Sequence, residues 1–237
     1  MEVHPHTHTE RKKWTHYLWE FLMLFLAVFC GFLAEYQLEH KIEKEKAQQY
    51  IYSFYEDLKT DTVNFKNIIL EYKRKMQILE TRGECFDTIS HNIKSTGCLE
   101  ALFNNSSHFP DMVYTDRTLQ QLKNSGGLRL LITADADSIL LYDNLLKQYT
   151  RAETTSFQET QTTIRNTLYS LLNYQKTRPG AIGVDLLVTD YKDLLNRYFN
   201  QLERYSKYCI DNIKDISELK SKATSFINYF KNKYNLK

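Results

Sequence analysis

The most apolar stretch of the chain lies near the N-terminus. From Phe21 to Ala34 the chain runs without a charged residue, and from Trp14 onward only His16 and Glu20 interrupt it. A helix over residues 14–34 would be about 31 Å long, enough to cross a bilayer. Aromatic residues suited to a membrane interface lie at its start: Trp14, Tyr17 and Trp19. The pattern predicts a transmembrane anchor at residues 14–34, preceded by a polar tail at residues 1–13.

Two kinds of cleaved signal use similar residues. A signal peptide needs small residues before the cut, but a cut after Ala34 leaves Phe32 three places back. A lipoprotein signal needs a small residue before its cysteine, whereas Cys30 follows Phe29. These features favour an uncleaved anchor, and a buried amphipathic helix is the main alternative.

Past the anchor, glycine and proline divide the chain into three long runs, residues 32–82, 128–178 and 184–237. Strand signals are weak, because β-branched residues do not alternate with polar ones and no Asn-Gly or Asp-Gly turn occurs. We therefore expect long helices at about 35–82, 135–175 and 185–232, joined by a crossover at 83–134. The predicted fold is all-α: the transmembrane helix continues into a long antiparallel helical bundle over residues 35–237.

Apolar residues at steps of three and four predict the buried face of each long helix. In the first run they are Ile51, Phe54, Leu58, Phe65, Ile68, Tyr72, Met76 and Leu79, with Asp61 at the one polar register position. In the second they are Ile139, Leu145, Tyr149, Ile164, Leu168 and Leu171. In the third they are Leu195, Tyr198, Leu202, Tyr205, Cys209, Ile213, Ile216, Ala223, Ile227 and Phe230. Such stripes are typical of a core rather than of a cofactor site.

The net charge bears on nucleic-acid binding, and the cysteines bear on a possible disulfide. Thirty-one basic and twenty-nine acidic residues give a net charge of +2, so the chain has no strong field for nucleic acid. Of four cysteines, Cys85 and Cys98 are neighbours in the least regular region, and we expect a disulfide between them. Two buried free thiols are the alternative, favoured if the bundle is cytoplasmic.

Candidate chemistry is sparse. His4, His6 and His8 alternate in the polar tail and are weak candidates for a transition-metal site, but no acid or cysteine completes a ligand set. A thiol nucleophile would need His91 or His108 beside Cys85 or Cys98. No metalloprotease, P-loop or Rossmann pattern occurs, and paired acids such as Asp135 and Asp137 do not converge on one helical face. We expect no enzyme activity, no catalytic residue and no cofactor.

A resemblance is carried by FLMLFLAVFCGFLAEYQLEH followed by QYIYSFYEDLKTD, together with TLQQLKNSGGLRLL. These segments resemble an uncharacterised family of small bacterial single-pass membrane proteins. The similarity covers residues 10–62 and, less closely, 115–132. It implies a bacterial inner-membrane anchor and adds nothing on mechanism.

Glu20 lies just inside the anchor, where a carboxylate is costly unless it reaches headgroups or a partner. Ala27 and Gly31 are four residues apart and permit close helix approach, and Glu20 lies seven residues before Ala27 on the same face. We predict either an interfacial Glu20 or a seam for self-association made of these three residues.

The function that these features favour is a membrane-anchored interaction protein, a scaffold or assembly subunit without catalytic activity. Its expected partners are the lipid bilayer and either further copies of the chain or another membrane protein. An extracytoplasmic small-molecule sensor and a homo-oligomeric pore built from the anchor helices are the alternatives. Basic residues flank the anchor on both sides, and we expect the short N-terminal tail inside and the bundle in the periplasm.

Overall fold

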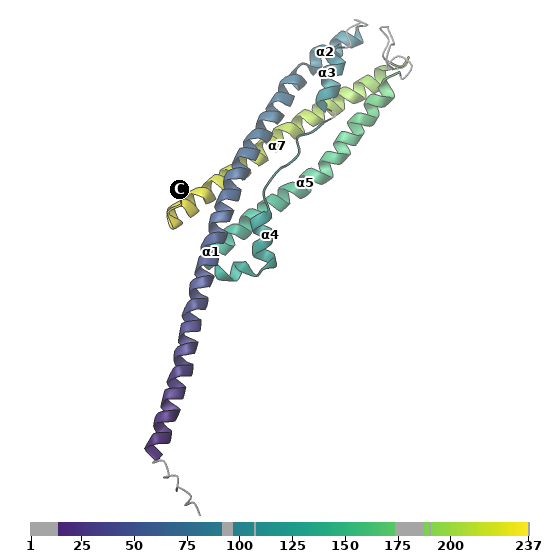
Figure 1. Cartoon of the computed structure of the whole chain (residues 1–237). Helices are drawn as coiled ribbons and strands as arrows, with labels where there is room; N and C mark the ends of the chain where they lie inside the picture. The colour runs from purple at the N-terminus through teal and green to yellow at the C-terminus, as the bar shows by residue number, and fades with distance from the viewer. Residues whose placement is uncertain (1–13, 92–96, 107, 174–186, 190, 237) are drawn as a thin grey trace, which may run out of the picture. The chain divides into compact units, whose positions relative to one another are not determined.

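The computed structural model describes residues 14–91, 97–106, 108–173, 187–189 and 191–236, without the side chains of residues 152–157 (Figure 1). Over these residues the regular structure is helical, which confirms the all-α class. The histidines of the N-terminal tail, His4, His6 and His8, lie outside the described residues.

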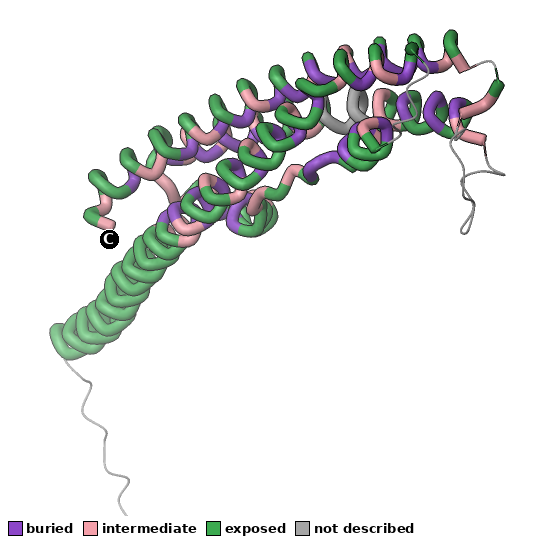
Figure 2. The backbone as a smooth tube through the Cα atoms, turned by 90° about the horizontal axis from the view of Figure 1, so that it is seen from above, coloured by how far each residue is buried: buried purple, intermediate pink, exposed green. Residues whose placement is uncertain are grey.

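The chain divides into two compact units, of which the first ends at Gln49 and the second begins at Tyr50. The first helix, α1 (Trp14–Glu80), contributes residues to both. In the first unit nearly every described residue is exposed, as the green tube of Figure 2 shows. In the second unit the same helix carries a buried face, with Ile51, Phe54 and Leu58 at its start. Steps of three and four place these side chains on one side of the helix.

The rest of the second unit consists of two long helices and a crossover. The crossover contains α2 (Arg82–Ser90), α3 (Gly97–Ser106), α4 (Arg117–Asn124) and the short 3₁₀ helix η1 (Gly127–Leu130). It is followed by α5 (Thr133–Leu171) and α7 (Tyr191–Tyr234).

Within the second unit, α1 and α5 run in the same direction and α7 runs antiparallel to both (Figure 1). Near one end of the bundle the ring of Phe54 meets Tyr142 of α5 and Phe230 of α7, with centroids 5.9 and 5.7 Å apart. Near the other end, Arg82 is hydrogen-bonded to Glu203 of α7. The crossover therefore returns the chain to the end where Phe54 lies, so that α5 can start there.

Two glycines allow the turn from α4 into η1. Gly126 has φ +67°, a left-handed conformation that glycine adopts without strain. A Cβ on Gly127 would lie 2.9 Å from the ring of Tyr50 and 3.0 Å from Leu122. The close packing of Tyr50 on α1 thus requires glycine at residue 127.

Helix boundaries differ from those expected. The packed unit begins at Tyr50 rather than at residue 35, because the intervening charged segment has little apolar surface to bury. The first helix ends at Glu80 instead of residue 82, and Gly83 lies inside α2. The second helix spans Thr133–Leu171 rather than 135–175, and the third Tyr191–Tyr234 rather than 185–232.

The core contains the expected stripes and additional residues. Leu145, Ile213 and Ile227 are only partly buried, as is Met76. The crossover adds Leu99, Leu102, Phe109, Leu119 and Leu122, which are buried. Tyr142, Leu146, Phe199 and Leu219 are buried too, although the periodicity did not select them.

Candidate functional site

The first unit of α1 exposes apolar side chains along a full membrane-spanning length. Within the described residues, it is the one stretch long and apolar enough to cross a bilayer, with a mean hydropathy of 2.0. None of that stretch is buried. A buried amphipathic helix, the main alternative to an anchor, would instead be covered by the rest of the protein.

One face of this segment combines polar and small residues. His16 Nε2 lies 3.3 Å from Glu20 Oε1, and both side chains are about half exposed (49% and 50%). Seven residues turn a helix by about 700°, so Ala27 lies within about 20° of Glu20, and Gly31 lies about 20° to its other side. The space around the Cα of Gly31 is open, with no heavy atom within 4 Å of a Cβ placed there. The helix thus brings together the three residues that the sequence selected.

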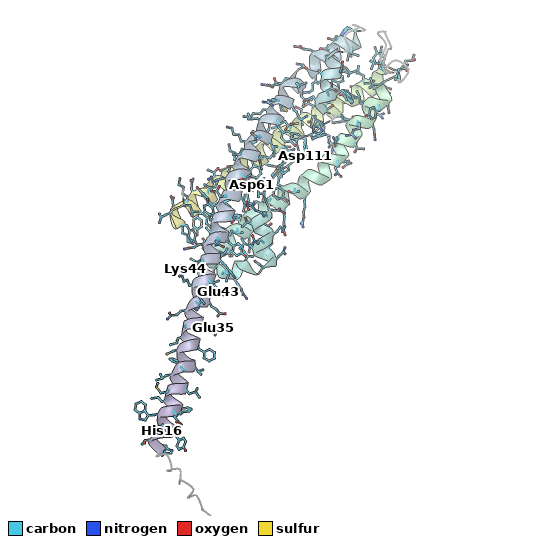
Figure 3. All side chains as sticks on the ribbon, viewed as in Figure 1. His16, Glu35, Glu43, Lys44, Asp61 and Asp111 are labelled. Carbon is cyan, nitrogen blue, oxygen red and sulfur yellow. A yellow bond between two sulfur atoms is a disulfide. The ribbon has the colours of Figure 1, made fainter. Side chains whose placement is uncertain are left out.

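The opposite face carries aromatic rings. Phe25 and Phe29 lie about 140° and 180° from Glu20 around the helix, with ring centroids 5.9 Å apart, and Phe21, at about 100°, stacks on Phe25 at 6.3 Å. Beyond them, Tyr36 packs edge-on against His40 at 4.2 Å. The two faces of the segment are therefore chemically distinct. Figure 3 labels His16 at the start of α1 and Glu35 further along it.

Cys85 and Cys98, the pair for which the sequence predicts a disulfide, are bonded, with the Cα atoms 5.7 Å apart. The bond joins α2 to α3. The His91 ring lies 2.7 Å from the carbonyl oxygen of Asp87, and the backbone carbonyl of His108 accepts from Lys75. In the described part of the chain, no group of three His, Cys, Asp or Glu residues could hold a metal ion.

Two carboxylates one turn apart on α1 hold the end of the crossover. Asp57 accepts hydrogen bonds from the Arg117 guanidinium at 3.1 Å and from the Thr118 backbone N–H at 3.2 Å. Asp61 accepts from the Thr115 backbone N–H at 2.6 Å and from the Tyr142 hydroxyl at 2.7 Å. Both carboxylates are buried, and Asp61 links α1, the crossover and α5 at one point.

Burial raises the pKa of Asp61 to about 6, although its hydrogen bonds from Tyr142 and Thr115 oppose this shift. The nearby charge of Asp57 raises it further. The sequence places Asp61 at the one polar position in the apolar stripe of this helix. Nothing in the sequence indicates that Thr115 and Tyr142 are its hydrogen-bond partners.

The middle of the crossover is held by a buried lysine. Lys75 Nζ donates to the carbonyl oxygens of Asn105, at 2.8 Å, and His108. In return, the Asn105 side chain donates to the Lys75 carbonyl at 3.0 Å. Burial lowers the pKa of Lys75, and the charge of Glu71 partly opposes that. Sequence reasoning missed this residue, because a lysine in a charged helix gives no sign of burial.

Asp135, at the start of α5, fixes the end of α7. It accepts hydrogen bonds from the Tyr229 hydroxyl at 2.8 Å, from Lys233 at 2.6 Å and from the Tyr234 hydroxyl. Burial raises the pKa of Asp135, but these three donors outweigh burial and hold the pKa below its usual value. The acid that the sequence paired with Asp137 therefore has a structural role.

A groove of about 250 Å³ lies between α5 and α7. It is lined by Leu145, Gln148, Tyr149, Asp215, Glu218, Leu219 and Lys222. Burial, together with the charges of Glu218 and Asp211, raises the pKa of Asp215. The groove offers apolar walls, two carboxylates and the ammonium of Lys222, so its lining carries a formal charge of −1 when all three groups are ionised.

Fold and site together define a class: a helical-bundle protein with one N-terminal helix that is long and apolar enough to cross a membrane. No family model, curated protein or solved structure matches the chain.

Counting the free thiols tests the disulfide between Cys85 and Cys98. Alkylation of the denatured, unreduced protein should label Cys30 and Cys209 only, because Cys85 and Cys98 are bonded. Intact-mass measurement should therefore show two adducts, rising to four after reduction. Four adducts without reductant would exclude the bond.

Asp61 should make stability depend on pH between about 4 and about 6. Its pKa in the fold, about 6, exceeds the ordinary 3.8, so the folded chain binds the proton more tightly than the unfolded chain does. The contribution of Asp61 to the free energy of unfolding should therefore increase as pH falls through 6, by up to about 1.4 kcal/mol per unit of pKa difference.

Asp61→Asn is the matched variant, because the amide can still accept from Thr115 and meet the Tyr142 hydroxyl but cannot titrate. Urea denaturation from pH 7.5 to 4.5 should show the wild type gaining stability relative to the variant. Parallel curves for the two proteins would contradict the raised pKa. Comparison with the variant is needed because Asp135 and Asp143, whose pKa values are lowered, act in the opposite direction.

Proposed function

We propose that this chain is a single-pass membrane protein whose helical bundle acts as a scaffold or assembly subunit through contacts with other proteins. It carries out no reaction of its own. The observation that carries the proposal is the exposed apolar segment of α1, which needs a lipid or protein environment along its whole length. The resemblance to small bacterial single-pass membrane proteins supports the membrane anchor and carries no information on the role of the bundle.

The use made of the buried ionisable groups also supports a structural role for the bundle. Asp57 and Asp61 hold the crossover, Lys75 holds its middle, and Asp135 holds the end of α7. Each group is occupied by partners from a different element. Such groups stabilise one arrangement of helices, which is what a scaffold presenting a fixed surface requires.

The anchor supplies the association surface in this proposal. Small residues at Ala27 and Gly31 let a neighbouring helix approach closely, and Glu20 offers a carboxylate to a donor on that helix. A carboxylate at the bilayer centre costs about 2.5 to 3.5 kcal/mol on insertion scales and less near the interface. Contact with a partner would offset that cost.

Glu20→Leu tests the association surface. The substitution removes an unfavourable group from the apolar segment, so insertion into membranes should be unchanged. Chemical cross-linking in membranes and size in detergent should both show weaker association. Phe25→Leu, on the aromatic face, is the control and should leave both measurements unaltered. If Glu20→Leu behaves like this control, Glu20 is an interfacial residue and a seam that includes Glu20 is not used.

We infer a bacterial inner-membrane location with the N-terminus inside and the bundle in the periplasm. The short basic tail around Arg11, Lys12 and Lys13 is hard to export, which favours keeping it inside. The bond between Cys85 and Cys98 is stable in an oxidising compartment and rare in the cytoplasm. Both features favour the same orientation.

Alkaline phosphatase fused after Lys237 reports the orientation, because it is active only when exported. We expect an active fusion, and an inactive β-galactosidase fusion at the same position. The reverse pair of results would place the bundle in the cytoplasm, where the disulfide would not persist.

A small-molecule sensor is a second candidate, favoured by the groove between α5 and α7. Tyr149 and the carboxylates of Asp215 and Glu218 would recognise a small organic ammonium compound by charge and ring contacts. Calorimetric titration of the full chain with such compounds should then show binding that Asp215→Asn weakens several-fold. A set of ammonium compounds that all fail to bind would remove this candidate.

A further inference from the structure

The face of α1 around Glu20 continues beyond the apolar stretch. Leu38 lies eighteen residues after Glu20, five helical turns, and Ile42 lies one turn further. Both side chains are exposed, by 58% and 41%. They are the two large aliphatic residues of the otherwise charged segment 35–49. At about 100° per residue, both lie within about 40° of Glu20 around the helix.

Another side of that charged segment carries contacts among its own side chains. Tyr36 packs edge-on against His40, and His40 lies 3.7 Å from Glu43. Phe29 and Tyr36 lie about 160° to 180° from Glu20, on the aromatic face. The Glu20 face, defined by His16, Glu20, Ala27, Gly31, Leu38 and Ile42, is therefore a continuous strip about 39 Å long.

We propose that the Glu20 face binds the same face of a second copy of this chain, in a parallel pair. The inference rests on the anchor proposed above and names its partner. Leu38 and Ile42 of the two copies then cover each other outside the apolar stretch, and Ala27 and Gly31 let the two backbones approach inside it.

Charge complementarity favours a second copy of this chain as the partner of the Glu20 face. Copies of one chain insert the same way round, so His16 of one copy lies one helical turn, about 6 Å along the axis, from the level of Glu20 in the other. Each copy carries an imidazole one turn from a carboxylate, 3.3 Å apart. A two-fold axis along the helices lets the His16 of each copy reach the Glu20 of the other, so the face is complementary to itself.

Cysteine cross-linking in native membranes tests the geometry. In a Cys30→Ser background, Ala27→Cys and Leu38→Cys place thiols on the Glu20 face, while Phe29→Cys and Tyr36→Cys place them on the aromatic face. Oxidation should give a covalent dimer several-fold more readily from the first two than from the second two. Equal yields, or no dimer from any variant, would overturn the pairing.

A charge exchange tests the complementarity. Glu20→His gives a copy with two imidazoles, and His16→Glu gives a copy with two carboxylates. Differently tagged copies of these two variants should co-purify with each other several-fold better than either does with itself. Equal recovery in all combinations would overturn the pairing of His16 with Glu20.

The proposed function and the proposed pairing of two copies are excluded by different results. If Glu20→Leu alters association with other membrane proteins while the cross-links show no face preference, the second copy is excluded and the proposed function stands. If Glu20→Leu changes nothing and the Glu20 face still cross-links, the copies pair through the small and aliphatic residues, and the inferred contribution of Glu20 is wrong.

Discussion

The bundle depends on the hydrogen bonds that buried groups of α1 make to the crossover. The chain leaves α3 and returns along the bundle to α4, so its backbone polar groups have no helical partners there. Asp57 and Asp61 accept from the backbone N–H groups of Thr118 and Thr115, and Lys75 donates to carbonyls further back. An unsatisfied buried group would cost about 1–3 kcal/mol, so these contacts determine the path of the crossover.

Burial and hydrogen bonding compete at each of these sites, and the balance differs. At Asp61 burial dominates and the pKa rises to about 6, even with two donors in place. At Asp135 three donors, one of them the Lys233 ammonium, dominate and the pKa falls. The difference follows from the partners: Asp61 has neutral donors, whereas Asp135 has a cation at 2.6 Å.

One continuous helix carries two kinds of surface, and its backbone hydrogen bonds are internal along both parts. Residues up to Gln49 expose their side chains, apolar first and then charged, while residues from Tyr50 onward bury one face. A helix needs no water to satisfy its backbone, so its side chains alone decide which solvent it suits. In the first unit they also distinguish two faces, one with Glu20 and small residues and the other with stacked phenylalanines.

The sequence by itself determined the features that depend on neighbours along the chain. The apolar stretch and the helical stripes follow from local spacing. The spacing of Cys85 and Cys98 predicted a disulfide but left two free thiols as an alternative, and the structure shows the bond. Tertiary structure decided the partners of the buried charges, because Asp61 meets Tyr142 and Asp135 meets Lys233 only once the helices lie side by side. Residue spacing shows which face of a helix is polar or apolar. Which helix covers that face depends on the path of the crossover, and local periodicity does not predict that path.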